Sequence, residues 1–572
     1  MDRQAGSVSP SLEELWQRAD LSLQQALADH DNQGIASAVA TFEQAADLAG
    51  QTGDPNHPAA LINLTNALLV QAEECYSDAA LDKALKLTKR HDHLFSDHPL
   101  RLAYLGKRGR ALLIKAQRTA DLTVMRRAVQ VQRQRQKVAH KRHPQHGECM
   151  LDLGVSLIHS SAMADSPREL DEAVAVLTAA KRRPDNSADP AAVLSALGNA
   201  RLNRFLHITR RDPADLAASV EEHTAAVDEM TPGDPNAATY LSDLGTALMR
   251  DYEHTGNPES INASVPRHRQ AIDATPDGHA RKAERIFGLA SALLVLHEST
   301  GDPEVLDEAI AQFRAAVGAT IPDHAHHARC LYGLASALLR RGELRGMMFD
   351  YDEAAVLAGQ AVEATRNGHA NLPGRLAFYA VASCALGAAS ELVKADEALR
   401  RASGLLRHDN PALAQIQSNH GVILEAIARN SDDDPAEARH RAKEAVRLTR
   451  QAVEATPHQH SEYKGQLLNF AAASATWARL AGDATALDRP LDLYAAIQRP
   501  TSPEPSDTLL ELARAQVLSC RYELTKDTEA ATGAIGAYQH VAEDPQQSTI
   551  RRLNAGCLGA DIATRSQATD PA

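Results

Sequence analysis

Aromatic residues are scarce in this chain of 572 residues. They make up 4% of the sequence, whereas hydrophobic residues together make up 44%. An interior with so few rings has to be filled with Ala, Leu, Val and Ile, as closely packed helices allow. The composition therefore argues against strand-rich folds.

Paired cysteines are missing as well. The six cysteines are Cys75, Cys149, Cys330, Cys384, Cys520 and Cys557. They lie far apart and form no Cys-x-x-Cys pair, so the sequence indicates neither a zinc site nor a disulfide framework. A reducing compartment fits this usage best.

Long apolar runs are also absent. No stretch approaches the roughly 18 apolar residues of a membrane span, and residues 1–10 lack the apolar core of a secretory signal. The formal net charge of -14 argues against nucleic acid binding across the whole surface, although it leaves local basic patches open. We expect a soluble, cytoplasmic protein, and its abundant Arg and Ala resemble the usage of GC-rich actinobacterial genomes.

Motifs that carry chemistry are lacking too. The chain has no Gly-x-Ser-x-Gly elbow, phosphate-binding loop, dinucleotide fingerprint or His-Glu-x-x-His. Histidines such as His140, His143 and His146 gather where turns are expected, and their spacing specifies no tetrahedral site. We therefore predict no cofactor and no metal, assign no catalytic residue, and favour a non-enzyme.

What the sequence does contain is a repeat of about 45 residues. Each copy centres on a small residue, and consecutive copies lie 41 to 51 residues apart. These residues are Ala19, Thr65, Gly109, Gly154, Gly198, Gly245, Ala290, Ala335, Ala380, Gly421, Ala472, Ala513 and Cys557. Such regular spacing indicates a solenoid rather than independent domains.

Each repeat predicts two helices. Apolar residues four before and one before the small residue, such as Leu61 and Leu64, indicate an amphipathic helix A with one crowded point. Sixteen residues after the small residue comes a second signature, for example Leu306-Asp-Glu-Ala-Ile310, which indicates a helix B. Turns such as Gly301-Asp302-Pro303 supply a capping side chain and a proline for the first turn.

These units resemble tetratricopeptide (TPR) repeats. The Leu-x-x-Leu-Gly of residues 241–245 and the Ala309 to Phe313 segment followed by Ala316 are similar to that family's pattern. The unit is longer than the standard repeat of about 34 residues, and it resembles the long-unit actinobacterial arrays that lie N-terminal to CHAT domains. Because the periodicity continues to Cys557, we expect no CHAT domain here. The resemblance implies an all-α fold, an α-solenoid of about 12 to 13 antiparallel helix pairs in a right-handed superhelix.

The expected organisation follows from this array. We predict a disordered N-terminal tail over residues 1–10, the repeat array over 11–430, further repeats over 431–566, and a polar tail over 567–572. The acidic run Asp432 to Asp434 and a long spacing place a subdomain break near residues 430–435.

The candidate binding surface is the groove that helices A line in such arrays. If the TPR register holds, positions one after and three before the small residue, with their neighbours, face that groove. The predicted groove residues are Asn63, Asn66, Arg110, Ser195, Asn199, Asn203, Ser242, Thr246, Arg329, Tyr332, Ser336, Arg340, Ser418, Asn419 and Asn469. Small and amide side chains suit hydrogen bonding to a peptide or helix; the alternative is that they are merely solvated.

A second candidate surface is basic. The residues are Arg126, Arg127, Arg133, Arg135, Lys137, Lys141 and Arg142, with no acidic residue between Asp121 and Glu148. They could hold an acidic segment, phosphate or nucleic acid. A charged run on a helix is usually a solvated face, and no aromatic residues interleave to stack bases, so nucleic acid is the least favoured partner.

The sequence thus favours a non-catalytic interaction scaffold, an adaptor or sensor with a regulatory role, whose groove holds a peptide or helical segment of another protein. The alternative is an enzyme or small-ligand receptor with a pocket inside the superhelix. The partner's identity, the pathway and the oligomeric state stay open.

Overall fold

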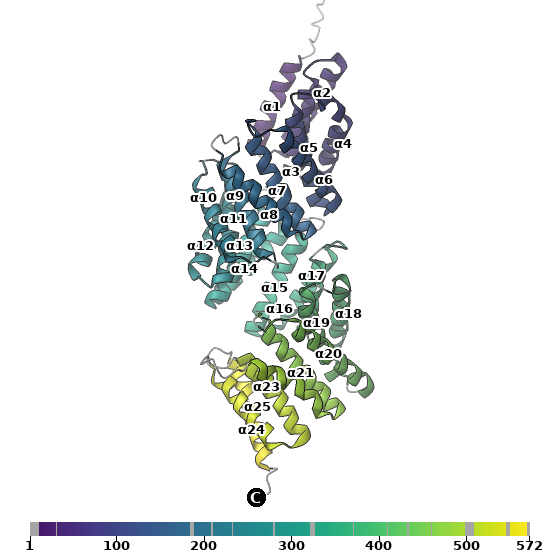
Figure 1. The fold of residues 1–572 in the computed structure, drawn as a ribbon, viewed down its shortest axis with the longest axis vertical. Coiled ribbons are helices and arrows are strands. Elements are labelled where there is room, and N and C mark those ends of the chain that lie inside the picture. Colours follow the sequence, from purple (N-terminus) through teal and green to yellow (C-terminus); the bar gives the residue numbers. More distant parts are fainter. Residues whose placement is uncertain are drawn as a thin grey trace, which may run out of the picture. The chain divides into compact units, whose positions relative to one another are not determined.

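The computed structural model describes residues 11–29, 31–183, 188–207, 210–231, 233–277, 279, 281–320, 326–369, 371–408, 410–431, 434–458, 460, 462–497, 508–544 and 549–568. Every regular element within these ranges is a helix (Figure 1), which confirms the predicted all-α solenoid. The predicted tail over 1–10 lies outside the described residues. Helix α25 continues to Ala568, two residues into the predicted C-terminal tail, whose last four residues also lie outside.

The odd-numbered helices correspond to the predicted helices A, and each contains one of the thirteen small residues. Their bounds are α1 Leu12–Ala28, α3 His57–Glu74, α5 Arg101–Thr119, α7 His146–Ala164, α9 Pro190–Leu206, α11 Ala237–Thr255, α13 Lys282–Thr300, α15 His327–Arg345, α17 Leu372–Ala385, α19 Ala412–Arg429, α21 Tyr463–Ala481, α23 Thr508–Thr525 and α25 Thr549–Ala568.

The even-numbered helices correspond to helices B. Their bounds are α2 Asn32–Thr52, α4 Asp78–Arg90, α6 Leu122–Val138, α8 Pro167–Lys181, α10 Pro213–Asp228, α12 Pro258–Asp273, α14 Pro303–Gly318, α16 Met348–Glu363, α18 Ala389–Leu405, α20 Pro435–Ala455, α22 Asp488–Ile497 and α24 Thr528–Glu543. Two short 3-10 helices, η1 Asp92–Phe95 and η2 Ala484–Leu487, complete the described elements.

The turns between helices A and B are specified locally, as the sequence predicts. Gly301 adopts a φ of 69°, a left-handed conformation that ends α13. The Asp302 carboxylate then accepts a hydrogen bond from the backbone N–H of Glu304 at 2.9 Å, and Pro303 occupies the first turn of α14. Asn257 caps α12 in the same way, at 3.1 Å.

The small residue of helix A is a point of close approach. A Cβ placed on Gly154 would lie 2.5 Å from Cγ of Leu177, and one on Gly245 would lie 2.8 Å from the His268 ring. Each of these large side chains comes 23 residues after its glycine, on the following helix B. A side chain at the glycine would push the two helices apart.

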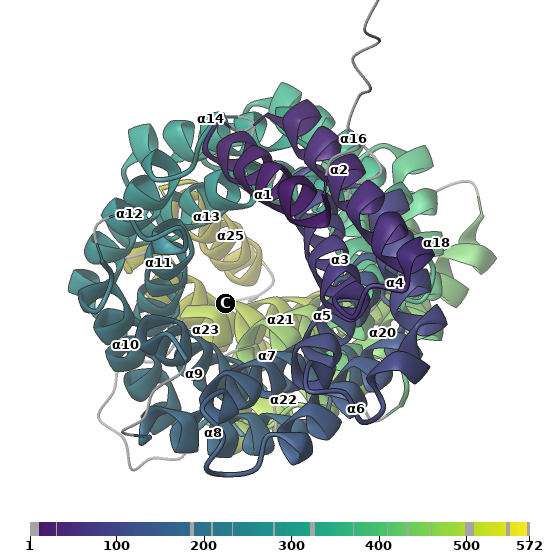
Figure 2. The same cartoon turned by 90° about the horizontal axis from the view of Figure 1, so that it is seen from above.

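The chain divides into an N-terminal unit, Met1–Gly333, and a C-terminal unit, Leu334–Ala572. Within each unit, most consecutive odd-numbered helices contact one another, as α7 does α9 and α19 does α21, whereas consecutive even-numbered helices make no comparable contact among the described residues. Because helices A lie closer together than helices B, the array curves with helices A inside. Figure 2 shows this for α3 to α14 of the N-terminal unit. The break expected near residues 430–435 lies inside the C-terminal unit and stays a prediction.

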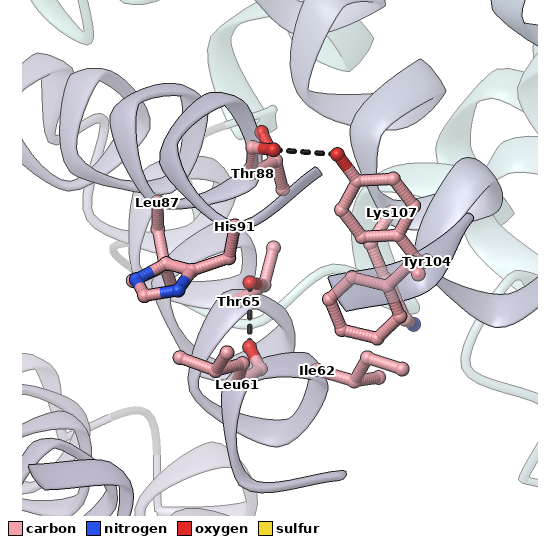
Figure 3. A pocket seen from close by; sticks show the side chains of 9 residues that line it. Leu61, Ile62, Thr65, Leu87, Thr88, His91, Tyr104 and Lys107 are labelled. Carbon is pink, nitrogen blue, oxygen red and sulfur yellow. Dashed lines mark hydrogen bonds between the residues drawn. The ribbon is translucent and has the colours of Figure 1, made fainter. Parts of the chain in front are cut away.

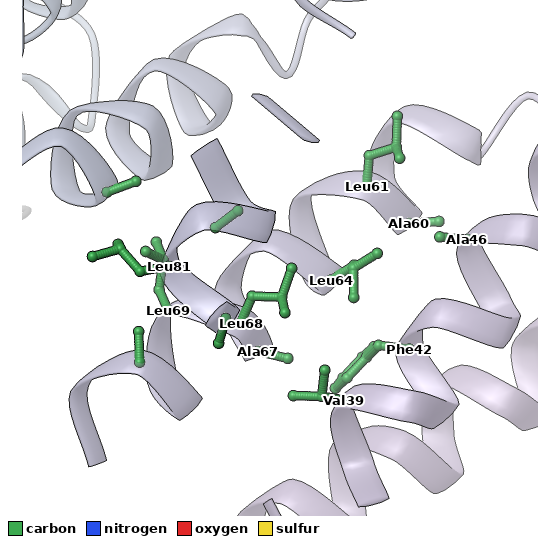
Figure 4. Close-up of a cluster of buried hydrophobic side chains, with 14 of the residues drawn as sticks. Val39, Phe42, Ala46, Ala60, Leu61, Leu64, Ala67, Leu68, Leu69 and Leu81 are labelled. Carbon is green, nitrogen blue, oxygen red and sulfur yellow. The ribbon is translucent and has the colours of Figure 1, made fainter. Parts of the chain in front are cut away.

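The apolar core runs along the array instead of forming one centre. Between α2, α3 and α4, for example, Phe42, Leu64 and Leu68 meet Leu81, and all four side chains are buried (Figure 4). Similar clusters recur along both units. Each helix pair therefore shields its apolar side with its neighbours. Across the described part of the chain, every helix is too short or too polar to span a bilayer.

The close approach at Gly154 predicts a loss of stability on adding one methyl group. Gly154→Ala would force Leu177 to move, and we expect it to lower the free energy of unfolding by about 1–3 kcal/mol. Gly318→Ala is the matched control, because nothing lies within 4 Å of that position. Urea denaturation followed by circular dichroism measures both. Equal midpoints for Gly154→Ala and the wild type would contradict the predicted contact.

Buried histidines predict a pH dependence. His268 is fully buried, neither ring nitrogen has a hydrogen-bond partner among the described residues, and burial lowers its pKa to about 4. The unfolded chain, with an ordinary histidine pKa of about 6.5, binds a proton that the folded chain does not. Stability is therefore lost as the pH falls from about 6.5 towards 4.

His268→Leu should remove this contribution, since Leu177 occupies the equivalent position in another repeat. Relative to wild type, the variant should gain about 1.4 kcal/mol of unfolding free energy for each pH unit between 6.5 and 4. Urea denaturation at several pH values measures the difference, with the exposed His140→Gln as control. A difference that does not change with pH would show that His268 titrates normally.

Candidate binding face

The exposed sides of helices A form the candidate binding surface, which we call the A-face. In each unit it lies on the inner side of the curve, because helices A are the closely spaced layer. The structure places the predicted groove residues on helices A and shows how their polar groups are used.

Several predicted groove residues join neighbouring helices. Ser195 and Asn199 on α9 both donate hydrogen bonds to the Asp243 carboxylate on α11, at 2.9 and 2.8 Å. Lys107 on α5 donates to the Asn66 side-chain oxygen on α3 at 2.6 Å. These polar groups stabilise the stack of helices A, so part of their hydrogen-bonding capacity is already used.

Other predicted groove residues bond within or beside their own helix. The Thr246 hydroxyl donates to the backbone carbonyl of Ser242 at 3.0 Å, and the Asn203 amide donates to the carbonyl of Asn199 at 2.8 Å. Arg340 pairs with Glu343 at 3.3 Å, and Arg110 pairs with Glu73 on α3. Asn63 and Tyr332 are exposed, and Ser336 is half-buried.

A row of amides crosses two adjacent helices of the C-terminal unit. This amide row consists of Gln415 and Asn419 on α19 and of Gln466 and Asn469 on α21. The Gln466 side-chain amide donates a hydrogen bond to the Gln415 side-chain oxygen at 3.2 Å. The Gln415 side-chain amide in turn donates to the Asn419 side-chain oxygen at 2.9 Å. Asn469 donates to the hydroxyl of the buried Ser418 at 2.9 Å.

The amide row keeps unused hydrogen-bonding capacity. The side-chain oxygen of Gln466 is buried and has no partner among the described residues, and the same holds for Gln516 on α23. Among the described residues, the Asn419 amide nitrogen and the Asn469 amide oxygen form no hydrogen bond with another side chain. Buried polar atoms without partners are costly in a folded protein. The Gln466 oxygen is enclosed by the protein, whereas the Asn419 and Asn469 side chains are only half-buried and reach the surface.

Sequence reasoning missed the glutamines of this row. Gln415 and Gln466 each lie three residues before a predicted groove position, Ser418 and Asn469. Residues three apart share a helix face. Extending the predicted positions by one turn towards the start of each helix would have identified both glutamines.

The predicted basic surface on α6 is smaller than the sequence suggests. The Arg135 side chain is only 3% exposed: it passes Gly106, donates to the backbone carbonyl of Leu102 at 3.2 Å, and pairs with Glu148 and Asp152 on α7. Arg133 pairs with Glu172 at 2.6 Å. The exposed basic residues that remain are Arg126, Arg127, Lys137, Lys141 and Arg142.

An open hollow lies between α3, α4 and α5 (Figure 3), lined by Leu61, Ile62, Thr65, Leu87, Thr88, His91, Phe95, Tyr104 and Lys107. Its hydroxyl groups are already used. Thr65 donates to the Leu61 carbonyl at 2.7 Å, and Tyr104 bonds both the Thr88 carbonyl and Asp92. Burial raises the pKa of Tyr104 further above its already high ordinary value, away from the range useful for acid–base catalysis at neutral pH. The hydroxyl groups that line the hollow are therefore not activated, whereas burial lowers the pKa of Lys107 and of His91.

The cysteines offer no activated nucleophile. Burial raises the pKa of the Cys149 thiol to about 11, and that of Cys330 to about 11 as well. Because the thiolate is the reactive form, these side chains remain inert at neutral pH. Among the described residues, no group of three or more His, Cys, Asp or Glu side chains is arranged to hold a metal ion.

No protein-family model and no curated protein matches this chain. Among solved structures, it is similar to the apo form of RapI, with 11% identity, 70% of this chain and 97% of that chain covered, and a TM-score of 0.42. A Rap protein complexed with Competence and Sporulation Factor matches at 12% identity, 68% and 99% coverage, and a TM-score of 0.39. The C-terminal part of a TPR repeat-containing protein from Cytophaga hutchinsonii matches at 12% identity, 56% and 95% coverage, and a TM-score of 0.32. At these similarities the matches give this chain neither a family nor a ligand.

The placement of Arg135 predicts a structural role. Arg135→Met keeps much of the side-chain volume but leaves Glu148 and Asp152 without their cation. We expect the free energy of unfolding to fall by about 3 kcal/mol, the lower end for a buried pair, since both carboxylates are partly exposed. Urea denaturation measures this loss. The exposed Arg127→Met should change stability by less than about 0.5 kcal/mol; equal effects from the two variants would rule out the buried ion pair.

Proposed function

We propose that this protein is a non-catalytic helical-repeat scaffold, an adaptor or sensor with a regulatory role in the cytoplasm. Its A-face binds a peptide or helical segment of another protein. The observation that carries the proposal is the amide row, where the half-buried Asn419 and Asn469 on two adjacent helices A keep a donor and an acceptor without a side-chain partner among the described residues.

Amide side chains suit an extended peptide backbone. A backbone exposes one donor and one acceptor at each residue, and a side-chain amide can meet both at once. The spacing between α19 and α21 is set by the fold, so the row needs little reorganisation to receive such a segment. In this mode of recognition, hydrogen bonds to the peptide backbone supply affinity. Contacts with the peptide's side chains supply specificity.

The alternative of a small-ligand receptor or an enzyme has less support. The hollow at α3 to α5 has its hydroxyl groups already bonded, and the buried thiols of Cys149 and Cys330 remain protonated. Nucleic acid binding through α6 also loses support, because Arg135 and Arg133 are occupied by ion pairs within the protein.

The proposal predicts that peptides bind through their backbone at the amide row. Peptides selected from a random library against the full chain should lose affinity for the Asn419→Ala, Asn469→Ala double variant by roughly 5- to 100-fold. This corresponds to one or two hydrogen bonds of about 1 kcal/mol or slightly more each. Isothermal titration calorimetry measures the dissociation constants. N-methylation of the contacting peptide bonds should weaken binding to the wild type by a similar factor.

The matched control is Asn262→Ala, which removes an exposed amide on α12, a helix B. It should leave affinity unchanged. Selection of no peptide, or equal affinity for the double variant and the wild type, would refute peptide binding at the amide row.

A further inference from the structure

Helices B start after a capping residue throughout the described part of the array, except at two neighbouring positions. The usual capping residue is Asp, Asn or Ser, namely Asp31, Ser77, Asp121, Ser166, Asp212, Asn257, Asp302, Asp434, Asp483 before η2, which leads into α22, and Asp527. Helices α16 and α18 instead start after Met347 and Ala388, and neither side chain makes a capping hydrogen bond. Both helices belong to the C-terminal unit.

The α15–α16 turn has the backbone of a capped turn without its residues. Gly346 and Gly301 have φ values of 66° and 69°. The next residue of each turn is extended, with φ and ψ of -86° and 103° after Gly346 and of -71° and 116° after Gly301. The Met-Met-Phe of residues 347–349 therefore occupies the place of the Asp-Pro-Glu of residues 302–304.

The apolar side chains of this turn are exposed although its backbone is anchored. Phe349 is 70% exposed and Met348 is 56% exposed. The next residue, Asp350, is fully buried and pairs with Arg341 on α15 at 2.8 Å. The start of α16 is therefore held against α15 while its apolar side chains face solvent.

The α17–α18 turn continues this apolar surface. Residues 385–390, Ala-Leu-Gly-Ala-Ala-Ser, carry no charge, and Val393 on α18 is exposed. Helix α17 packs between α16 and α18 (Figure 1). Because α16 and α17 are antiparallel neighbours of 16 and 14 residues, the start of α16 lies beside the end of α17. We call residues 344–349 and 385–390 the apolar edge.

The apolar edge has no evident reason within the fold. A missing cap lowers the stability of a helix, and contiguous exposed apolar side chains mark interaction sites in soluble proteins. Methionine adapts to irregular partners because its side chain is flexible and polarizable. Methionine and aromatic residues are also enriched at protein interfaces. The edge therefore departs from the local pattern in the direction of a contact surface.

The charges around the apolar edge indicate which partner fits it. The exposed or half-buried acidic residues in the first halves of α16 and α18 are Asp352, Glu353, Glu391 and Glu397, against the basic Arg345 and Lys394. Lys394 already pairs with Glu391 at 2.7 Å. The surroundings are thus net negative, as is the whole chain at -14. This charge disfavours an anionic membrane or a second copy of the chain and favours a basic partner.

We propose that the apolar edge binds an amphipathic helix of another protein. The apolar side of that helix covers Met348 and Phe349, and its Lys or Arg residues face the carboxylates of α16 and α18. The edge lies at turns between helices A and B, outside the A-face. The proposal therefore stands whether or not the amide row binds a peptide.

The test rebuilds a capped turn in the full chain. The variant Met347→Asp, Met348→Pro, Phe349→Glu carries the sequence of residues 302–304, so its urea midpoint should equal or exceed that of the wild type. The probe is a synthetic amphipathic helix of leucine and lysine, titrated calorimetrically. Its affinity should fall about tenfold or more, as expected when an aromatic anchor is lost. The two added negative charges would by themselves strengthen binding of this peptide.

A second variant tests whether both turns form one surface. Ala388→Asp, Ala389→Pro rebuilds a capped start of α18, and it should also weaken peptide binding without lowering the urea midpoint. Unchanged affinity in either turn variant would overturn the proposal. Circular dichroism checks that the variants are folded, and Phe349→Ser replaces the triple variant if that one is not.

The controls separate this surface from apolar exposure and charge in general. Leu21→Glu changes an exposed leucine on α1 and should leave affinity unchanged, as should Asn419→Ala, Asn469→Ala. A peptide with glutamate in place of lysine should bind the wild type more weakly. Vesicles of phosphatidylcholine and phosphatidylserine, and sedimentation of the protein alone, test the other occupants. Vesicle binding or self-association that the triple variant abolishes, without peptide binding, would overturn the proposal.

Discussion

The close approach of each helix A to the following helix B is the constraint on which this structure depends. At Gly154 and Gly245, a side chain of helix B occupies the space that a Cβ would need. With the helices this close, small and aliphatic side chains fill the interior and few rings are required. The low aromatic content of the chain is consistent with this close packing.

The same spacing creates the A-face and limits what it can bind. Helices A approach one another closely enough for side chains such as Asn199 and Asp243 to bond across them. These bonds stabilise the array, and each one removes a donor or acceptor from the surface. Polar groups keep unused capacity only where they outnumber their internal partners, as in the amide row on α19 and α21.

Arginine side chains also differ in whether they have partners within the protein. Arg135 is enclosed by Glu148 and Asp152 and stabilises the packing of α5, α6 and α7. Arg281 and Arg329, also on the inner side of the N-terminal unit, have no such partners among the described residues.

The sequence alone determined the all-α solenoid, the helices A and B, and their caps, because these depend on periodicity, small residues and turn chemistry within about 45 residues. It also predicts that Asn419 and Asn469 face the groove. Only the tertiary structure decided which polar groups are free. Asn66 and Ser195 are occupied by bonds to the neighbouring helix A, and Arg135 is buried against Glu148 and Asp152. Such partnerships join residues 13 to 48 positions apart on different helices, and their geometry depends on how the helices stack, which local patterns do not specify.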